Sequence, residues 1–429
     1  MLRAAFVIVL LCTAAALAGQ SIIVRRIDIT GIHRTRRWVV ARELRFDVGD
    51  TITNKDLIGA RDRLSNLNLF NSVTVKATRD GIVSVRAPEL WPLWPVLGVS
   101  FSEGHFSDLF TRPKGFLKHA TLSVGGTYTN VLGTGAGLYG VGEIGASEGV
   151  DAEYHSRWVS ATVPLSLRVG FTDIRQTNTA PVSYDSTRYL RDIVYTVDAS
   201  THEGAPTRVG LKLKYRELHV QTGISHDLFV EDQKRYKTWW FSPYLILDRR
   251  NLEWYPTRGA YGEVRLDLVT GNTKFIISTY DVRGYFPLTE SDRPPLLALR
   301  LVTGTSADAT PKWAHFYYSF SNALRGFSDL GSESADYIIG NVELRYPLGS
   351  ESTYNVPLIG RYGKGWPWGV SAVTFLERGE LSLAGRRSER TGYGGGFYFR
   401  VPYFEILETS MTLRPSGHVS FNVSTSVAF

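Results

Sequence analysis

The sequence predicts a transmembrane antiparallel β-barrel of about 16 strands, preceded by one small α+β domain of order β-α-α-β-β. Three observations favour this class. The chain begins like an exported protein, and its later segments alternate strictly between apolar and polar residues. Beyond residue 20 it also contains no apolar run of about 18 residues, the length that a membrane-spanning helix needs.

The N-terminal segment has the layout of a secretory signal peptide. Residues 1–18 contain one basic residue, Arg3, then an apolar stretch over residues 4–11 and small residues up to Ala18. Such a segment is removed on export, and it is too short to cross a bilayer as a helix. The only cysteine, Cys12, lies within it, so we expect the mature chain to have no disulfide.

The alternation is clearest at the C-terminus, where HVSFNVSTSVAF (418–429) keeps a period of two up to the terminal aromatic Phe429. The same period recurs in GAYGEVRLDLVTG (259–271), LLALRL (296–301) and GNVELRY (340–346). In these segments one face is apolar and the other carries charges of both signs. This pattern is typical of a wall between lipid and a wet lumen, because in water the apolar face would be a large exposed patch.

The length of the second region gives the strand number. Residues 93–429 number 337, and a barrel strand with its connection takes about 21 residues, which gives about 16 strands. We therefore assign residues 91–429 to the barrel. A barrel of this size is wide enough for an aqueous channel unless something fills it.

Residues 19–90 predict a separate domain. Thr53 and Asp56 form a capping-box pair at the start of a helix. Val73 and Val75 face residues 82–85 across an Asp-Gly turn, as in a hairpin. A free edge of such a hairpin can accept an added strand through backbone hydrogen bonds.

The positive charge of the chain is concentrated in this domain. Residues 21–88 contain 13 Lys or Arg against 7 Asp or Glu, while the whole chain has a net charge of only +7. One interpretation is an ordinary solvated surface. The other is attraction to anionic lipid or to acidic clients.

The combination resembles the BamA/TamA superfamily of outer-membrane assembly and secretion barrels, here with a single POTRA domain before a bacterial surface antigen barrel. Four stretches carry the resemblance: LIGARDRLSNLNLFNSVTV (57–75), DRRNLEWYPTRG (248–259), LRGF (324–327), and the strand pair GNVELRYPL (340–348) with TFLERGEL (374–381). Together they extend over essentially the whole mature chain.

The resemblance implies a latch motif in a long extracellular loop. The motif consists of Leu324, Arg325, Gly326 and Phe327. In the family this loop folds back into the lumen, so Arg325 would pair with Glu343 and Glu377 on the barrel wall. Gly326 would allow the tight turn, and Phe327 would pack against the wall. The alternation independently places Glu343 on the polar face. Glu377 stands at a position where the family usually has Asp. The alternative to the latch is that Arg325 is an ordinary exposed arginine in a loop.

Further sites follow from the same resemblance. The barrel turn motif is Asp248, Arg250, Pro256, Thr257, Arg258 and Gly259, for which we expect an ordinary tight turn. Phe429 would be the C-terminal barrel signal, and Val73 and Val75 would form the POTRA edge that receives a client strand.

The function that the resemblance implies is assembly, insertion or translocation of polypeptide clients at the bacterial outer membrane, with the POTRA domain in the periplasm. The expected partners are unfolded outer-membrane or secreted proteins, membrane lipids and accessory periplasmic proteins or lipoproteins. We expect no nucleic acid, metal or cofactor to take part.

Two other classes of function remain open at this point. The first is a passive, porin-like solute channel or a dedicated secretion pore. The second is an enzyme, which we do not expect, because the sequence contains no Gly-x-Ser-x-Gly elbow and no His-Glu-x-x-His metal motif.

Overall fold

The computed structural model describes residues 21–101, 120–177, 189–221, 234–291, 293–307, 309–317, 324–325, 327, 333–383, 385–401 and 405–424. The predicted signal peptide (1–18), Gly326 and Phe429 lie outside the described residues. Among the helices within these ranges, none has both the length and the apolar character that a membrane crossing requires.

The N-terminal domain has the predicted element order, with two additional two-residue strands. Its elements are β1 (Ile22–Ile23), β2 (Arg26–Thr30), α1 (Arg37–Leu44), β3 (Thr51–Ile52), α2 (Asn54–Asn66), β4 (Thr74–Ala77) and β5 (Ile82–Arg86). The three longer strands form a sheet of order β2-β5-β4, in which β5 is central. Apolar side chains of both helices and of β5 are buried together in one core, as expected for two packed layers.

Local sequence explains how these elements begin and pair. The backbone N–H of Thr53 donates to the Asp56 carboxylate at 2.8 Å, completing the predicted capping box of α2. In the hairpin Val75 pairs with Val85, as expected. Val73, which we placed on the same strand, instead precedes it, because the ladder with β5 begins at Thr74.

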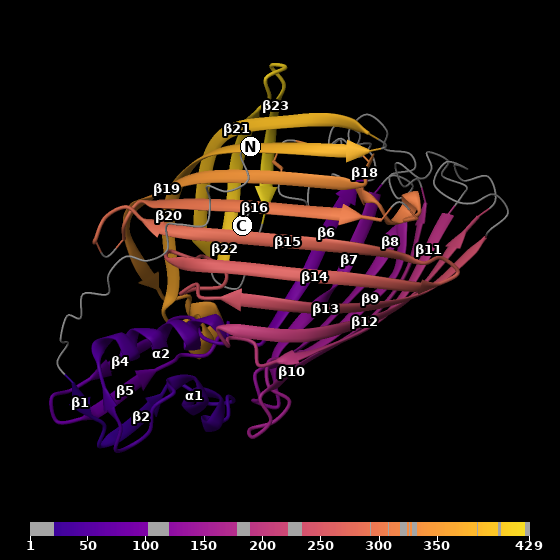
Figure 1. The fold of residues 1–429 in the computed structure, drawn as a ribbon. Coiled ribbons are helices and arrows are strands. Elements are labelled where there is room, and N and C mark those ends of the chain that lie inside the picture. The colour runs from indigo at the N-terminus through magenta and orange to yellow at the C-terminus, as the bar shows by residue number, and fades with distance from the viewer. Residues whose placement is uncertain are drawn as a thin grey trace.

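The rest of the described chain forms one antiparallel sheet of 16 strands, which confirms the predicted barrel (Figure 1). The strands are β6 (Leu93–Phe101), β7 (Ala120–Val131), β8 (Ala136–Gly145), β9 (Ser147–Ser156), β10 (Leu165–Thr177), β11 (Tyr189–Thr201), β12 (Thr207–Val220), β13 (Arg235–Asp248), β14 (Gly259–Gly271), β15 (Phe275–Pro287), β16 (Leu296–Ser306), β19 (Asp336–Tyr354), β20 (Trp366–Leu383), β21 (Arg386–Val401), β22 (Glu405–Leu413) and β23 (Val419–Ser424). The first strand, β6, and the last, β23, are the two ends of the strand order.

The segments between the barrel strands add four short elements. The connection between β16 and β19 contains η1 (Lys312–Ala314), β17 (Phe316–Tyr317) and β18 (Glu333–Ser334), and η2 (Pro357–Gly363) joins β19 to β20. Figure 1 shows the N-terminal domain, in indigo, against one end of the barrel. We call this the proximal end.

The two faces of the barrel strands have the predicted characters. On β19, Val342 and Leu344 are 43% and 44% exposed, whereas Glu343 and Arg345 between them are 0% and 1% exposed. Apolar side chains therefore cover the outside of the barrel, where lipid would lie, and the charged side chains of the same strand point into the lumen.

Candidate functional site

The centre of the site is Arg325, which lies in the lumen and contacts the inner wall of the barrel. Its guanidinium donates through Nη2 to Glu343 at 2.5 Å and through Nε to Glu377 at 2.6 Å. Both ion pairs expected from the sequence are therefore present. The Arg325 side chain is only 9% exposed, and those of both glutamates are 0% exposed.

The structure adds a third carboxylate that the sequence reasoning missed. Nη1 of Arg325 forms an ion pair with Glu408 on β22 at 2.9 Å. The guanidinium carbon also lies 3.6 Å from the centre of the Phe375 ring, and the Tyr398 hydroxyl on β21 accepts a weaker hydrogen bond at 3.4 Å. One loop side chain thus contacts four consecutive strands, from β19 to β22.

The backbone and the neighbours of Arg325 also fix the loop. The Arg325 backbone N–H donates to Glu377 at 2.6 Å. Leu324 and Phe327 are buried against the wall at 4% and 7% exposure, together with Ile339 of β19. The arginine is therefore held by its main chain, its side chain and the apolar residues on either side of it.

A second arginine offsets part of the negative charge of the cluster. Nη2 of Arg345, on β19, forms an ion pair with the other oxygen of Glu343 at 2.7 Å. The two arginines face three glutamates, Glu343, Glu377 and Glu408, all nearly inaccessible to water. Because an unpaired buried charge is costly, the carboxylates of this cluster depend on Arg325 for compensation.

The connection between β16 and β19 has a second anchor on another part of the wall, which the sequence did not indicate. Trp313 of η1 lies 5.7 Å from Tyr236 and 5.9 Å from Phe275, measured between ring centres. The Arg216 guanidinium carbon on β12 lies 5.3 Å from the Trp313 ring. The connection between β16 and β19 therefore contacts strands β12, β13 and β15 at one point and strands β19 to β22 at another.

The turn motif forms the connection between β13 and β14 at the proximal end. Arg250 donates to Asp248 at 2.6 Å, and the Thr257 N–H donates to Asn251 at 3.0 Å. Gly259 has φ +105°, and a Cβ there would lie 2.2 Å from the Arg249 carbonyl oxygen. The motif is thus a tight turn, as expected, and only glycine fits its last position.

The two remaining residues of the motif have different surroundings. Pro256 is buried. Arg258 forms a long ion pair of 3.5 Å with Asp62 on α2, so the turn also contacts the N-terminal domain.

No metal site accompanies these residues. Within the described ranges, no group of three or more His, Cys, Asp or Glu side chains is arranged to hold a metal ion.

Sequence comparison identifies both parts of the chain. Residues 130–359 match the Omp85 superfamily domain, and residues 22–86 match the POTRA family described as surface antigen variable number repeat. The first match spans more than half of the chain. The chain belongs to the Omp85 superfamily. No curated protein matches it.

Solved structures of low sequence identity share the fold of this Omp85 chain. BamA from Haemophilus ducreyi lacking POTRA domains 1–3 has a TM-score of 0.54 at 14% identity, with 94% of this chain and 84% of that chain covered. CdiB from Acinetobacter baumannii also has a TM-score of 0.54 at 13% identity, with 94% of this chain and 73% of that chain covered. CdiB from Escherichia coli has a TM-score of 0.52 at 13% identity, with 98% of this chain and 93% of that chain covered.

The POTRA domain of this Omp85 chain is joined to the barrel by a stack of side chains. The Arg42 guanidinium of α1 lies 4.8 Å from both the Trp38 and the Trp158 rings. Trp158 in turn donates its Nε1–H to His202 at 3.2 Å. Burial lowers the pKa of His202 to about 4, so the imidazole is uncharged near neutral pH, and the bond from Trp158 requires the tautomer with its proton on Nδ1.

Charged and amide groups extend the same junction. Burial would raise the pKa of Glu203, but His155 and Arg157 lower it to about 2. The Asn66 side chain, at the end of α2, donates to the Asn251 carbonyl at 3.2 Å and accepts from the Glu253 N–H at 3.0 Å. These contacts hold the domain against three turns of the barrel, after β9, β11 and β13.

The POTRA sheet has β4 at one edge and β2 at the other. Val75 lies on the β4 edge and Val73 just before it. An edge strand exposes backbone N–H and C=O groups to which another strand can bind. The position of the predicted client-strand edge is therefore an edge of the sheet in the structure.

Proposed function

We propose that this Omp85 protein receives unfolded polypeptide clients at the periplasmic face of the bacterial outer membrane and inserts them into, or passes them across, that membrane. Family membership and the shared fold support the general class. The proposed reaction makes and breaks no covalent bond and requires no nucleotide. The free energy comes from burial of the client's apolar surface in lipid.

The observation that carries the proposal is the contact of Arg325 with four strands at the C-terminal end of the strand order. Glu408, one of its three carboxylates, lies on β22, and β22 pairs directly with the last strand, β23. Among the described residues, β6 and β23 form no ladder with each other. The latch therefore orders the strands beside the seam where a client strand would add.

The other end of the strand order is also suited to opening. β6 contains Pro95, which has no backbone N–H to donate. We infer that the β6–β23 seam is the place where the barrel opens to a client.

An open solute channel fits the structure less well. Arg325 occupies space inside the barrel beside β19 to β22, and Trp313 packs on Tyr236 of β13. A passive channel requires this space to be free. A secretion pore would require the loop to leave its position during transport.

The direct test is reconstitution in liposomes with a urea-unfolded outer-membrane barrel as client. We expect the protein to increase the rate at which the client becomes heat-modifiable and protease-resistant, compared with liposomes that lack it. Ion conductance and transfer of a secreted client into the liposome lumen are measured in parallel. No acceleration of barrel insertion, together with high conductance or with transfer of the secreted client, would replace the insertion proposal with one of the alternatives.

A further inference from the structure

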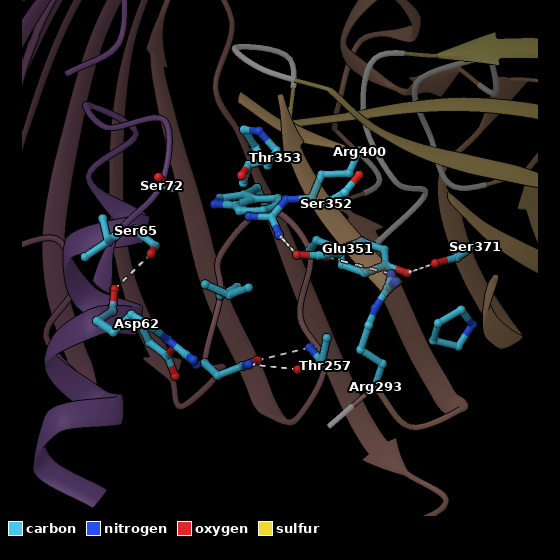
Figure 2. Close-up of a pocket in the computed structure, with 18 of the residues that line it drawn as sticks. Asp62, Ser65, Ser72, Thr257, Arg293, Glu351, Ser352, Thr353, Ser371 and Arg400 are labelled. Atoms are coloured by element: carbon cyan, nitrogen blue, oxygen red, sulfur yellow. Dashed lines mark hydrogen bonds and ion pairs between the residues drawn. The ribbon is translucent and has the colours of Figure 1, made fainter. Parts of the chain in front are cut away.

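A cavity of about 590 Å³ lies between the POTRA domain and the proximal ends of several barrel strands. Figure 2 shows Arg293, Glu351 and Arg400 on its barrel side and Asp62 and Ser65 of α2 on the opposite side. The cavity does not include Arg325 or its carboxylates, but Arg345 of the latch cluster forms part of its lining.

Cationic groups predominate in this cavity. Four arginines line it, Arg61, Arg293, Arg345 and Arg400, against two acidic residues, Asp62 and Glu351. Arg61 is paired with Asp62 at 2.7 Å, and Arg345 is paired with Glu343 of the latch. The remaining two arginines share one carboxylate.

That shared carboxylate is Glu351. It forms ion pairs with Arg293 at 3.8 Å and with Arg400 at shorter range. Its side chain is 37% exposed, and it lies where the β19–β20 register shifts between Leu348 and Ser352. Arg293 and Arg400 therefore form a site that binds a carboxylate, and in this structure the carboxylate is supplied by Glu351 of the chain itself.

Three buried polar atoms of the cavity lining have no hydrogen-bond partner among the residues that the structure describes. They are the Oδ1 atom of Asn71, Nε1 of Trp254 and Nε of Arg400. Asn71 is 5% exposed, and its amide nitrogen already donates to the Tyr362 carbonyl at 2.8 Å. The lining thus offers one acceptor and two donors, a set that a peptide with an amide N–H and a carboxylate would satisfy.

The cavity also continues into the edge of the POTRA sheet. Ser72 and Val73 line it, and the edge strand β4 begins at the next residue, Thr74. An extended segment that pairs with β4 would therefore bring one of its ends to the cavity.

We propose that this cavity binds a carboxylate of an extended polypeptide client, with Arg400 and Arg293 as its cationic partners and Asn71 Oδ1 accepting a client N–H. Glu351 then acts as an internal substitute that the client carboxylate displaces. This inference rests on the proposed function, because it specifies how the client is recognised. The carboxylate is either the client's terminal one or an acidic side chain.

The test uses the mature chain in phosphatidylcholine nanodiscs and a fluorescent peptide with the barrel-strand sequence of residues 418–429. We expect the free-acid peptide to bind about tenfold more tightly than its amide, measured by anisotropy, which corresponds to about 1.4 kcal/mol. A peptide amide with one Ser→Glu change near its end reports on acidic side chains. Tight binding of that amide assigns the site to side-chain carboxylates rather than to the chain terminus.

Variants locate the effect. Arg400→Gln and Arg293→Gln should each reduce the ratio of acid to amide affinity towards one, and Glu351→Gln should increase free-acid affinity by removing the competitor. Arg378→Gln is the matched control, because its ion pair with Glu389 is 66% and 60% exposed and lies outside the cavity. Heat-modifiability on a gel verifies that each variant is folded.

The outcomes separate this inference from the proposed function. Equal binding of the acid and amide peptides overturns the carboxylate site and leaves client reception intact. Binding of none of the peptides contradicts both. Loss of the acid preference in phosphatidylglycerol nanodiscs overturns the inference in favour of a lipid phosphate as the ligand.

Discussion

Arg325 combines four roles that no other described side chain of the barrel combines. It pairs with three buried carboxylates, packs on Phe375, anchors a loop and contacts four strands. Its planar guanidinium makes this possible, because separate nitrogens donate in fixed directions to Glu343, Glu377 and Glu408. A lysine would place one point charge where three directions are needed.

Replacing Arg325 with Ala should release the loop while leaving a folded barrel. Breaking a buried ion pair by removing one partner costs about 3–5 kcal/mol, and the three carboxylates would then recruit water or protons. We expect faster protease cleavage of residues 307–335, unchanged heat-modifiability and reduced client insertion. Arg325→Lys should have an intermediate effect.

The matched control for this prediction is Arg378→Ala, which removes an exposed ion pair on β20 and should change the free energy of unfolding by less than about 1 kcal/mol. Wild-type protease resistance and wild-type insertion in Arg325→Ala would show that the loop arginine is not a latch.

Some contacts of the Arg325 cluster could be predicted from the sequence and others could not. Alternation along β19 identifies Glu343 as lumen-facing, and the LRGF motif identifies its partner. Glu408 also alternates with outward apolar residues on its strand, but alternation gives a face and not a neighbour. Trp313 carries no periodic signal, so its contact with Tyr236 depends on the path of the loop.

At the scale of elements, the β13–β14 turn depends on one glycine. Gly259→Ala would force a Cβ into the Arg249 carbonyl at φ +105°, so we expect destabilisation of about 1–3 kcal/mol. The measurement is the urea midpoint of unfolding in detergent micelles. Gly262→Ala on the same strand is the control, since no atom lies within 4 Å of its added Cβ; equal midpoints for the two variants would contradict the strain argument.

The junction between the POTRA domain and the barrel should weaken as the pH falls. The pKa of His202 is about 4 in the folded protein against 6.5 in the unfolded chain. Between these values the unfolded chain binds more protons, so stability rises with pH. Protonation also removes the acceptor for the Trp158 N–H.

Hydrogen exchange measures this effect at residues 202–206. After correction for intrinsic rates, we expect exchange to increase from pH 6.5 to 4. Glu203, with a pKa lowered to about 2 from 4.5, extends the weakening below pH 4.5. His202→Gln keeps a hydrogen-bond acceptor but has no titrating group, so it should remove the change in exchange rate above pH 4.5. If this variant shows the same pH dependence as wild type, another group causes the effect.

The elements themselves were largely predictable. The capping box of α2 and the Val75–Val85 pair follow from local sequence. Val73 was misplaced because alternation continues past the point where the partner strand ends. The junction stack of Trp38, Arg42, Trp158 and His202 joins distant turns, and no local pattern marks it.

At the scale of the whole molecule, strand length and chain length predicted the 16-stranded sheet. The order of the strands in the sheet could be predicted as well, because segments that are neighbours in the sequence pair in antiparallel hairpins. The docking of the POTRA domain could not be predicted, because it depends on the turns after β7, β9, β11 and β13 and on the segment after β19, none of which alternation describes.

Deleting residues 21–88 should spare barrel folding and abolish client handling. The barrel has its own continuous ladder, whereas the client-receiving edge and the cavity beside Asn71 require the POTRA domain. The measurement is client insertion in liposomes, with heat-modifiability as the folding control. Full insertion without the domain would remove its proposed role.

The central claim is that this Omp85 protein handles other proteins of the outer membrane. It is tested most directly by depleting the protein in its host and quantifying all other outer-membrane barrels by mass spectrometry. We predict a broad or selective loss of barrels, restored by the wild-type gene and by Arg378→Ala but not by Arg325→Ala. An unchanged set of barrels would contradict the account and favour a dedicated secretion pore or a passive channel.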